Sequence, residues 1–306
     1  VQTCALPILG NYDPRNERAT RDIVSRSINS EIRAGRATPN GGVYIQMSHL
    51  GPDNVRKQFK GMVERCADSG FDLAGDLVEV VPTAHYMMGG LIFKADCSTE
   101  LPGLFAAGED TGGVHGANRL GGNGVANSTV FGGIAGEEMA NWVVSQSLQE
   151  CNMDEVRASI KAHEAPLERP AGDIELIRDA LAECMWDDVG ISRTKESLLR
   201  ARAKLDRLGQ QLHQIGVGDI QREYSITWQD WMNLNNLILV SKSVTEAALS
   251  RENSRGAHYR DDFPEPGSLE ESYFTAVQLG KDGLDIKNRP VQFTMIKPGE
   301  TILVEV

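Results

Sequence analysis

The sequence has no apolar run that approaches the ~20 residues needed to span a bilayer. Its five cysteines are scattered without metal-ligand spacing, which predicts reduced thiols and no metal site. Basic residues are in the minority, because 31 Lys and Arg stand against 43 Asp and Glu, a formal net charge of −12. This balance argues against nucleic acid or an anionic membrane surface as a direct partner. Any membrane contact is therefore expected to come through partner subunits.

The length and composition are those of a globular protein. At 306 residues, 41% of them hydrophobic, the chain can bury a large core in roughly two domains. In the first third, helical spacing of apolar residues predicts helices over 16–34 and 52–69. Short apolar runs predict strands over 42–47, 77–82 and 91–95.

The second half of the chain is predicted to be mainly helical. Four segments have apolar residues at helical spacing and predict a helical bundle: 153–162, 174–189, 195–214 and 230–251. Asp173 and Thr194 are natural N-caps for two of these helices. Three tryptophans are expected in the core: Trp186, Trp228 and Trp231. Two strand-like runs, 291–296 and 302–306, predict a small terminal β element.

Ten of the 31 glycines fall between Gly108 and Gly136. This stretch begins as an apolar strand ending in FAAG, continues as a loop of glycine and small polar residues, and is predicted to become a helix over 123–142. A strand, a glycine-rich loop and a helix N-terminus together can bind an anionic or electron-rich ligand. An ordinary strand-to-helix connection is the alternative, but the loop holds more polar side chains than a turn needs: Glu109, His115, Asn118, Arg119 and Asn123.

Four motifs in this order resemble the flavoprotein subunits of succinate dehydrogenase and fumarate reductase: AHYMMGG at 84–90, PGLFAAGED at 102–110, GVHGANRLGGN at 113–123 and ENSRGAHYRDDFP at 252–264. L-aspartate oxidase belongs to the same superfamily. The resemblance runs from about residue 18 to the end. It implies an FAD-dependent dicarboxylate oxidoreductase that interconverts succinate and fumarate by hydride transfer at flavin N5. An L-aspartate oxidase-like enzyme and a non-catalytic helical scaffold are the alternatives.

The resemblance also implies a domain order, with an α/β part followed by an all-α part. Residues 9–83 are expected to be part of a capping domain and 84–150 the C-terminal part of an FAD-binding domain. Residues 151–265 would form the helical bundle and 266–306 a C-terminal β extension. The family's dinucleotide-binding GxGxxG loop is not found, so the chain is expected to be a C-terminal fragment that is inactive alone. Residues 1–8, VQTCALPI, back-translate to a sequencing adapter and are expected to be a non-native leader.

The resemblance implies roles for substrate-contacting residues. Arg119 would bind a substrate carboxylate through its planar guanidinium, and His85 would hydrogen-bond a substrate carboxylate. Arg21 would deliver the proton, with Asp22 as its relay, because an arginine normally stays protonated in proteins. Without the resemblance, Arg119 reads as a surface ion-pair residue, His85 as a core histidine and Arg21 as an exposed first-turn arginine.

The resemblance likewise places the cofactor. Glu109 would accept hydrogen bonds from the adenosine or ribityl portion of FAD. The helix N-terminus at Gly121, Gly122, Asn123 and Gly124 would face the N1–O2 edge of the flavin, where the helix dipole stabilises negative charge. By the resemblance, many relatives have a serine where this chain has Gly124, so a hydroxyl contact to the flavin is expected to be lost or replaced by a backbone contact.

Partners and further contacts follow from the same resemblance. Arg255 and His258 would either contact the flavin edge or belong to a structural ion network. The expected partners are a dicarboxylate substrate and an iron–sulfur protein. The expected location is the cytoplasm, at the inner membrane through partner subunits.

Overall fold

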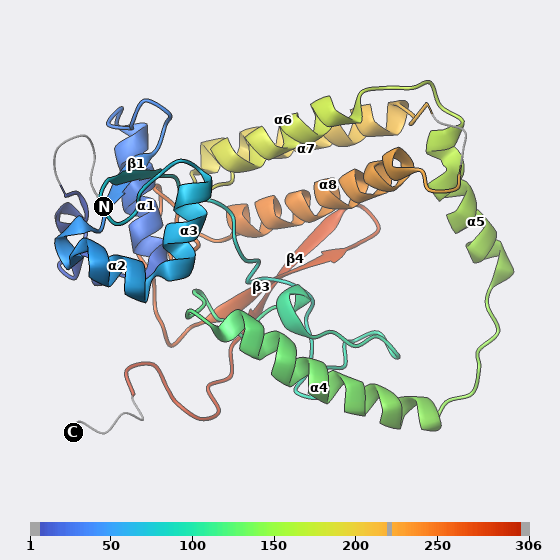
Figure 1. Cartoon of the computed structure of the whole chain (residues 1–306). Coiled ribbons are helices and arrows are strands. Elements are labelled where there is room, and N and C mark those ends of the chain that lie inside the picture. Colours follow the sequence, from blue (N-terminus) through green and yellow to red (C-terminus); the bar gives the residue numbers. More distant parts are fainter. Residues whose placement is uncertain (1–6, 219–221, 301–306) are drawn as a thin grey trace. The chain divides into compact units, whose positions relative to one another are not determined.

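The structure is a computed structural model that describes residues 7–218 and 222–300 (Figure 1). The chain divides into two compact units, Val1–His85 and Tyr86–Val306. Each unit has buried apolar clusters of its own. The expected domain boundaries of the capping, FAD-binding and helical parts remain predictions.

The first unit combines helices with a two-stranded antiparallel sheet. The sheet pairs β1 (Val43–Gln46) with β2 (Leu77–Val80), close to the predicted strands. Helix α1 (Arg21–Arg33) begins later than the predicted residue 16, because residues 16–18 form a separate 3-10 turn. The prediction that residue 8 belongs to a foreign leader is not tested, although Ile8 packs with Ile28 and Val43. Residues 1–6 lie outside the described part.

The predicted helix over 52–69 is two helices, α2 (Pro52–Gln58) and α3 (Lys60–Asp68). Phe59 separates them with a non-helical backbone, and its amide ends α2 by donating to the Val55 carbonyl. This break lets the apolar sides of both short helices reach one cluster around Val55 and Leu73. The periodicity alone could not predict the break, since it continues across Phe59.

Between the start of the second unit and α4, the described residues form no strand. The predicted strands over 91–95 and at Phe105 were wrong, since only single bridges occur, Leu91 with Thr111 and Ser98 with Phe105. A strand requires a neighbour that continues its hydrogen-bond ladder, and each bridge here stops after one residue pair. The long helix α4 (Asn123–Val144) begins where the sequence predicted.

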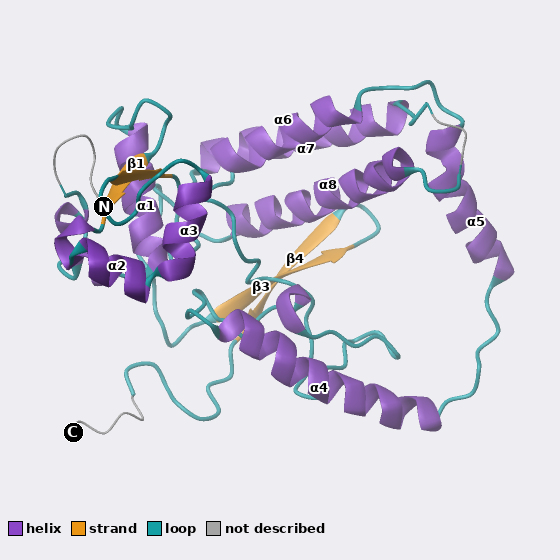
Figure 2. Cartoon of the chain, viewed as in Figure 1, coloured by secondary structure: helices purple, strands orange, loops and turns teal. Residues whose placement is uncertain are grey.

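The helical bundle is confirmed for three of the four predicted helices: its core lies between α6, α7 and α8, which run alongside one another in Figure 2, whereas the fourth, α5, has no buried residue. The helices of this part are α5 (Met153–Glu164), α6 (Ile174–Asp187), α7 (Lys195–Gln214) and α8 (Ile226–Ser250). The cap predictions are also confirmed. Asp173 accepts from the amides of Glu175 and Leu176, at 3.0 and 3.2 Å, and Thr194 forms a capping box with Ser197.

Two of the three tryptophans occupy the predicted positions. Trp231 is buried and donates through Nε1 to the Leu212 carbonyl at 3.2 Å, and Trp228 packs partly buried against the same core. The expectation was wrong for Trp186, whose exposed fraction is 47%. The buried side of α6 carries Ile177, Leu181 and Cys184. Trp186 follows Cys184 by two positions, so it lies on a different side of the helix.

The terminal β element lies earlier in the chain than predicted. Strands β3 (Tyr273–Leu279) and β4 (Leu284–Pro290) form an antiparallel hairpin, closed by a hydrogen bond of 2.7 Å from Gly280 N to the Gly283 carbonyl. Residues 291–296 form no strand, so that prediction was wrong, and 302–306 lie outside the described residues. The sequence does contain a signal for this hairpin that the prediction missed. It is the turn-forming stretch GKDG between two runs of residues that favour strands.

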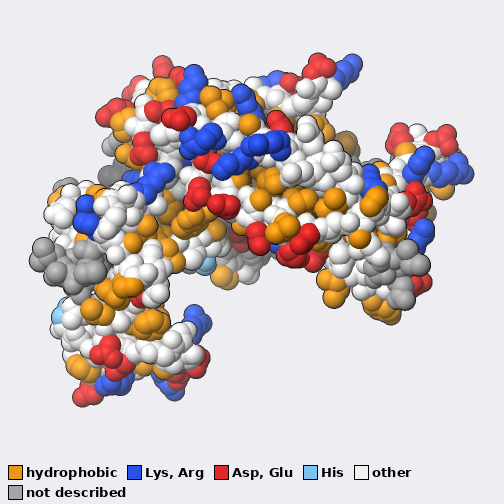
Figure 3. Space-filling view, turned by 90° about the horizontal axis from the view of Figure 1, so that it is seen from above, with side chains coloured by type: hydrophobic (Ala, Val, Ile, Leu, Met, Phe, Trp, Pro, Cys, Tyr) orange, Lys and Arg blue, Asp and Glu red, His pale blue; other side chains and the backbone are white. Residues whose placement is uncertain are grey.

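The surface carries charges of both signs. On the face shown in Figure 3, Lys and Arg side chains lie next to Asp and Glu side chains, with apolar side chains between them. Pairs such as Arg200–Glu196 and Lys204–Asp188 lie on or near α7. Among the described helices, none is both long enough and apolar enough to cross a membrane.

Arg260 has the largest fully buried side chain among the described residues, with an exposed fraction of 1%. Its Nη1 donates to the carbonyls of Ala248, Leu249 and Arg251, which end α8, at 3.0 to 3.3 Å. Its Nε and Nη2 bind both carboxylate oxygens of Asp262, at 2.7 and 2.8 Å. The same carboxylate accepts from the Lys195 amide at the start of α7. One guanidinium therefore links the end of α8 to the beginning of α7.

We expect Arg260→Ala to lower the free energy of unfolding of the second unit by about 3–5 kcal/mol, because it leaves Asp262 and the α8 carbonyls without their partner. Urea unfolding followed by far-UV circular dichroism measures this loss. Arg289→Ala is the matched control, since Arg289 forms an exposed ion pair with Glu100 at 2.7 Å and should unfold close to wild type. Equal effects of the two substitutions would contradict the role of Arg260.

Candidate functional site

The predicted helix N-terminus is the N-terminus of α4. Gly122 is the N-cap, with φ of 84°, and no side chain caps the helix. A Cβ on Gly122 would meet no atom within 4 Å, so space is open in front of the first turn. Gly121, Gly122 and Asn123 are exposed. The first turn thus presents backbone amides and the positive end of the helix dipole.

Arg119 lies half-buried just before this helix. Its guanidinium stacks on the Tyr86 ring, with Cζ 4.2 Å from the ring centroid. Its backbone amide contacts Met88 Sδ at 3.1 Å, and Nη1 lies 3.4 Å from the Leu120 carbonyl. In the part of the chain that the structure describes, no carboxylate pairs with it. The guanidinium therefore keeps N–H donors that an external carboxylate could bind bidentately.

A hydrogen-bond network holds the loop that carries Arg119. The Tyr86 hydroxyl lies 3.2 Å from His115 Nε2, and Asn127 Nδ2 lies 3.3 Å from the same nitrogen. Asn127 Nδ2 also donates to the Gly108 carbonyl at 3.0 Å. These contacts link the loop to Tyr86 on one side and to α4, through Asn127, on the other. Sequence reasoning missed Tyr86 and Asn127, because neither contact follows from spacing along the chain.

Glu109 lies at the other end of the loop, where the sequence predicted a cofactor contact. It is exposed, and its Oε1 accepts from the Met87 amide at 2.8 Å. Residues 86–88 thus contact both Glu109 and Arg119. The structure brings these predicted residues together around one short segment.

Gly124 fits closely beneath the Arg119 stack. A Cβ at this position would lie 2.8 Å from Tyr86 Cε2 and 3.4 Å from Arg119 Nη1. A serine here would collide with the tyrosine ring. The glycine at this position therefore leaves room for the stacked arrangement of Tyr86 and Arg119.

The remaining predicted residues lie in the first unit. Arg21 is the exposed first residue of α1, and Asp22 Oδ2 accepts from Arg26 Nη1 one turn later, at 3.2 Å. His85 is exposed and is the last residue of this unit. The assignment of proton transfer to Arg21 and Asp22, and of substrate binding to His85, remains a prediction.

Arg255 and His258 belong to a structural network. Arg255 donates to the carbonyls of Pro266, at 2.7 Å, and Ser268, and to the Ser272 hydroxyl at 2.8 Å. His258 Nδ1 lies 2.9 Å from Arg193 Nη1. Burial, together with the neighbouring arginines, lowers the pKa of His258 to about 3. The ring is therefore neutral near pH 7 and accepts from Arg193 through Nδ1.

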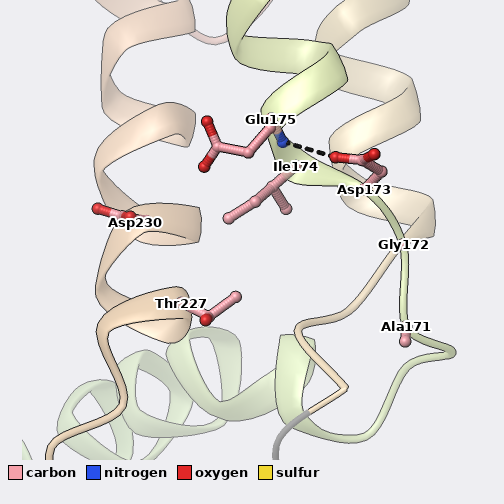
Figure 4. Close-up of a pocket in the computed structure, with 7 residues that line it drawn as sticks. All are labelled: Ala171, Gly172, Asp173, Ile174, Glu175, Thr227 and Asp230. Carbon is pink, nitrogen blue, oxygen red and sulfur yellow. Dashed lines mark hydrogen bonds between the residues drawn. The ribbon is translucent and has the colours of Figure 1, made fainter.

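A hollow of about 550 Å³ lies away from this loop, between the N-terminal ends of α6 and α8 (Figure 4). Its acidic side chains already have partners. Asp173 caps α6, while Glu175 and Asp230 pair with Arg178 at 2.9 and 3.4 Å. The hollow therefore lacks an unpaired group around which a site could form, and Arg119 remains the centre of the candidate site.

Two known families match the sequence. The one described as "FAD binding domain" matches residues 8–125, and the one described as "Fumarate reductase flavoprotein C-term" matches residues 178–302. The chain belongs to the flavoprotein family of fumarate reductases and succinate dehydrogenases. The resemblance seen in the sequence is thereby confirmed, and FAD is the cofactor of this family.

Individual relatives agree with this assignment. Over 261 residues the chain is 41% identical to a subunit of the fumarate reductase (CoM/CoB) of Methanothermobacter marburgensis, covering 84% of this chain and 47% of that protein. It is 31% identical to an L-aspartate oxidase of Synechocystis sp., covering 83% of this chain and 48% of that enzyme. A solved quinol fumarate reductase from E. coli matches with a TM-score of 0.85 and 28% identity, over 98% of this chain and 55% of that one. The chain spans about half the length of the curated relatives it matches.

The residues of this flavoprotein fit an FAD at α4. Its N-terminal turn has no side-chain cap, and the space beside Gly122 is open. The Asn127 side chain is buried, and its Oδ1 has no hydrogen-bond partner among the described residues. Uncapped amides and an unpaired amide oxygen are groups that a polar, partly anionic cofactor can satisfy.

We expect Gly124→Ser to lower the free energy of unfolding by about 1–3 kcal/mol, because its Cβ would press on the Tyr86 ring. Adding Tyr86→Ala should recover part of this loss, giving a non-additive double-mutant cycle in urea unfolding. Gly132→Ser is the matched control, since it lies in the same helix and its Cβ would meet nothing within 4 Å. Similar losses for both serines would exclude the proposed collision.

Proposed function

We propose that the chain is part of an FAD-dependent dicarboxylate oxidoreductase that interconverts succinate and fumarate. The observation that carries this proposal is the Arg119 guanidinium, stacked on Tyr86 beside the α4 N-terminus, with no carboxylate partner among the described residues. Bound FAD supplies the hydride chemistry, at its N5 atom. The protein's own residues then have to hold two carboxylates, orient the carbon chain and move one proton.

Arg119 and His85 are proposed to hold the two carboxylates. A guanidinium binds a carboxylate through two parallel hydrogen bonds, which fixes orientation as well as charge. Tyr86 supports Arg119 from one side, and this contact keeps the fork from turning freely. The Gly121–Gly124 backbone is proposed to stabilise negative charge at the flavin edge, and Glu109 to bind the cofactor's ribose or ribityl hydroxyls.

Arg21 is proposed to deliver the proton. An arginine can act as an acid only when its proton is restored quickly, so it requires a relay, and Asp22 follows it in the chain. Arg26 donates to Asp22 at 3.2 Å and orients this carboxylate on α1. A carboxylate beside Arg21 in the chain is a group that can accept a proton and pass it on.

L-aspartate oxidation is the second candidate, favoured by the 31% identity to an L-aspartate oxidase. The higher identity to the fumarate reductase of M. marburgensis, 41%, supports the first. Turnover of succinate against L-aspartate by the FAD-loaded full-length protein separates them. We further propose that an iron–sulfur protein is the electron partner, at the cytoplasmic side of the inner membrane. The M. marburgensis relative is named as one subunit of its enzyme, which supports an assembly of several chains.

Arg119→Ala should weaken binding of malonate, a dicarboxylate that cannot be dehydrogenated, by about 100-fold or more in the FAD-loaded full-length protein, because a charge-assisted bidentate contact is lost. Calorimetric titration measures the affinity, and flavin absorbance verifies that FAD is retained. Arg289→Ala, which removes an exposed arginine of the β4 strand, should bind malonate normally. Unchanged affinity in Arg119→Ala would remove this residue from the substrate site.

Arg21→Lys tests proton transfer separately from binding. The lysine keeps the positive charge but lacks the planar fork, so kcat and kcat/KM should both fall by about 100-fold or more, with KM little changed. Steady-state kinetics with fumarate, measured on the FAD-loaded full-length protein, give both parameters, and Arg18→Lys, just before α1, serves as control. A higher KM at normal kcat would instead assign Arg21 to carboxylate binding.

A further inference from the structure

A tight turn at residues 255–258 lies directly against the loop that carries Arg119. Two backbone hydrogen bonds close the turn, from Arg255 N to the His258 carbonyl at 2.8 Å and from His258 N to the Arg255 carbonyl at 3.0 Å. At its tip, the Ala257 amide donates to the Ala117 carbonyl at 2.9 Å. Ala117 precedes Arg119 by two residues. The backbone of the turn thus holds the backbone of the Arg119 loop.

Gly256 permits this close approach. Its φ is +55°, and a Cβ there would lie 2.1 Å from the Ala117 carbonyl oxygen and 3.0 Å from Asn118 Cβ. Two obstacles therefore exclude other residues, the left-handed backbone and the lack of space. The second is the more severe, because the blocking atom belongs to the backbone of the Arg119 loop and cannot rotate away.

Side chains fix the turn to the rest of the second unit. Arg255 binds the Pro266 carbonyl and the Ser272 hydroxyl ahead of β3. His258 contacts Arg193, whose Nε donates to the carbonyls of Val189 and Gly190 at 2.8 and 3.0 Å. These contacts reach the connection between α6 and α7 on one side and the segment that precedes β3 on the other. A turn held from both sides can act as a rigid support for the loop.

We infer that the 255–258 turn is a positioning element for Arg119: the Ala257 amide and the space left by Gly256 set where the guanidinium meets a dicarboxylate. This inference rests on the proposed role of Arg119. Its physical basis is that charge-assisted bidentate binding depends on both direction and distance. The glycine-rich loop cannot supply this precision itself, because glycines leave it conformationally free. The second unit supplies it from a segment distant in sequence.

The test compares Gly256→Ala with Gly267→Ala in the FAD-loaded full-length protein. Both glycines have positive φ, so both substitutions carry similar backbone strain, but a Cβ on Gly267 would have its nearest neighbours at 3.8 Å. We expect Gly256→Ala to raise the malonate Kd by about 10- to 100-fold, the size expected for a displacement of about 1 Å. Amide hydrogen exchange should also become faster over residues 113–119. Gly267→Ala should match wild type in both measurements.

A second variant loosens the turn without placing an atom against Ala117. Arg255→Lys loses the paired contacts to Pro266 and Ser272, and should weaken malonate binding in the same direction by a smaller factor. If Gly256→Ala does not fold, the malonate affinity of Arg255→Lys tests the inference by itself. Normal malonate binding by whichever of these variants folds overturns the inference, provided that Arg119→Ala abolishes binding. Normal binding by Arg119→Ala overturns the proposed substrate site and with it the inference.

Discussion

The second unit depends on one buried cation. Arg260 closes the end of α8 through three carbonyls and, through Asp262, reaches the first amide of α7. Burying a guanidinium is costly unless each N–H finds a partner, and here carbonyls and a carboxylate satisfy it. The turn at 255–258 lies in the segment between α8 and Arg260. The position of the turn, and of the Arg119 loop against it, therefore follows from where α8 ends.

Arg119 shows the opposite solution for a cation. It is half-buried, no carboxylate among the described residues neutralises it, and the face of Tyr86 is its main support. A cation–π contact partly offsets desolvation without occupying the hydrogen-bond donors. An ion pair would be more stable but would leave the guanidinium unable to bind a substrate. The two arginines thus differ in use: Arg260 stabilises the fold, and Arg119 is proposed to bind a ligand.

Local signals accounted for much of what the sequence predicted. The start of α4 at Asn123, the bounds of α7 and the caps at Asp173 and Thr194 all depend on neighbouring residues. Predictions failed where the outcome depended on distant partners. The run over 91–95 has the composition of a strand, but a ladder needs a second strand beside it. Trp186 is apolar and still exposed, because the packing of α6 fixed which side faces the core.

The sequence by itself determined the family, the helices that carry their own caps, and the glycine-rich loop with its single arginine. Each of these is encoded in contiguous residues, where backbone freedom and capping act over one or two turns. Only the tertiary structure decided that Tyr86 supports Arg119, that Asn127 ties the loop to α4, and that the Ala257 amide meets the Ala117 carbonyl. These contacts join segments far apart along the chain. Their geometry is fixed when the helices pack, and the spacing of residues in the sequence does not predict it.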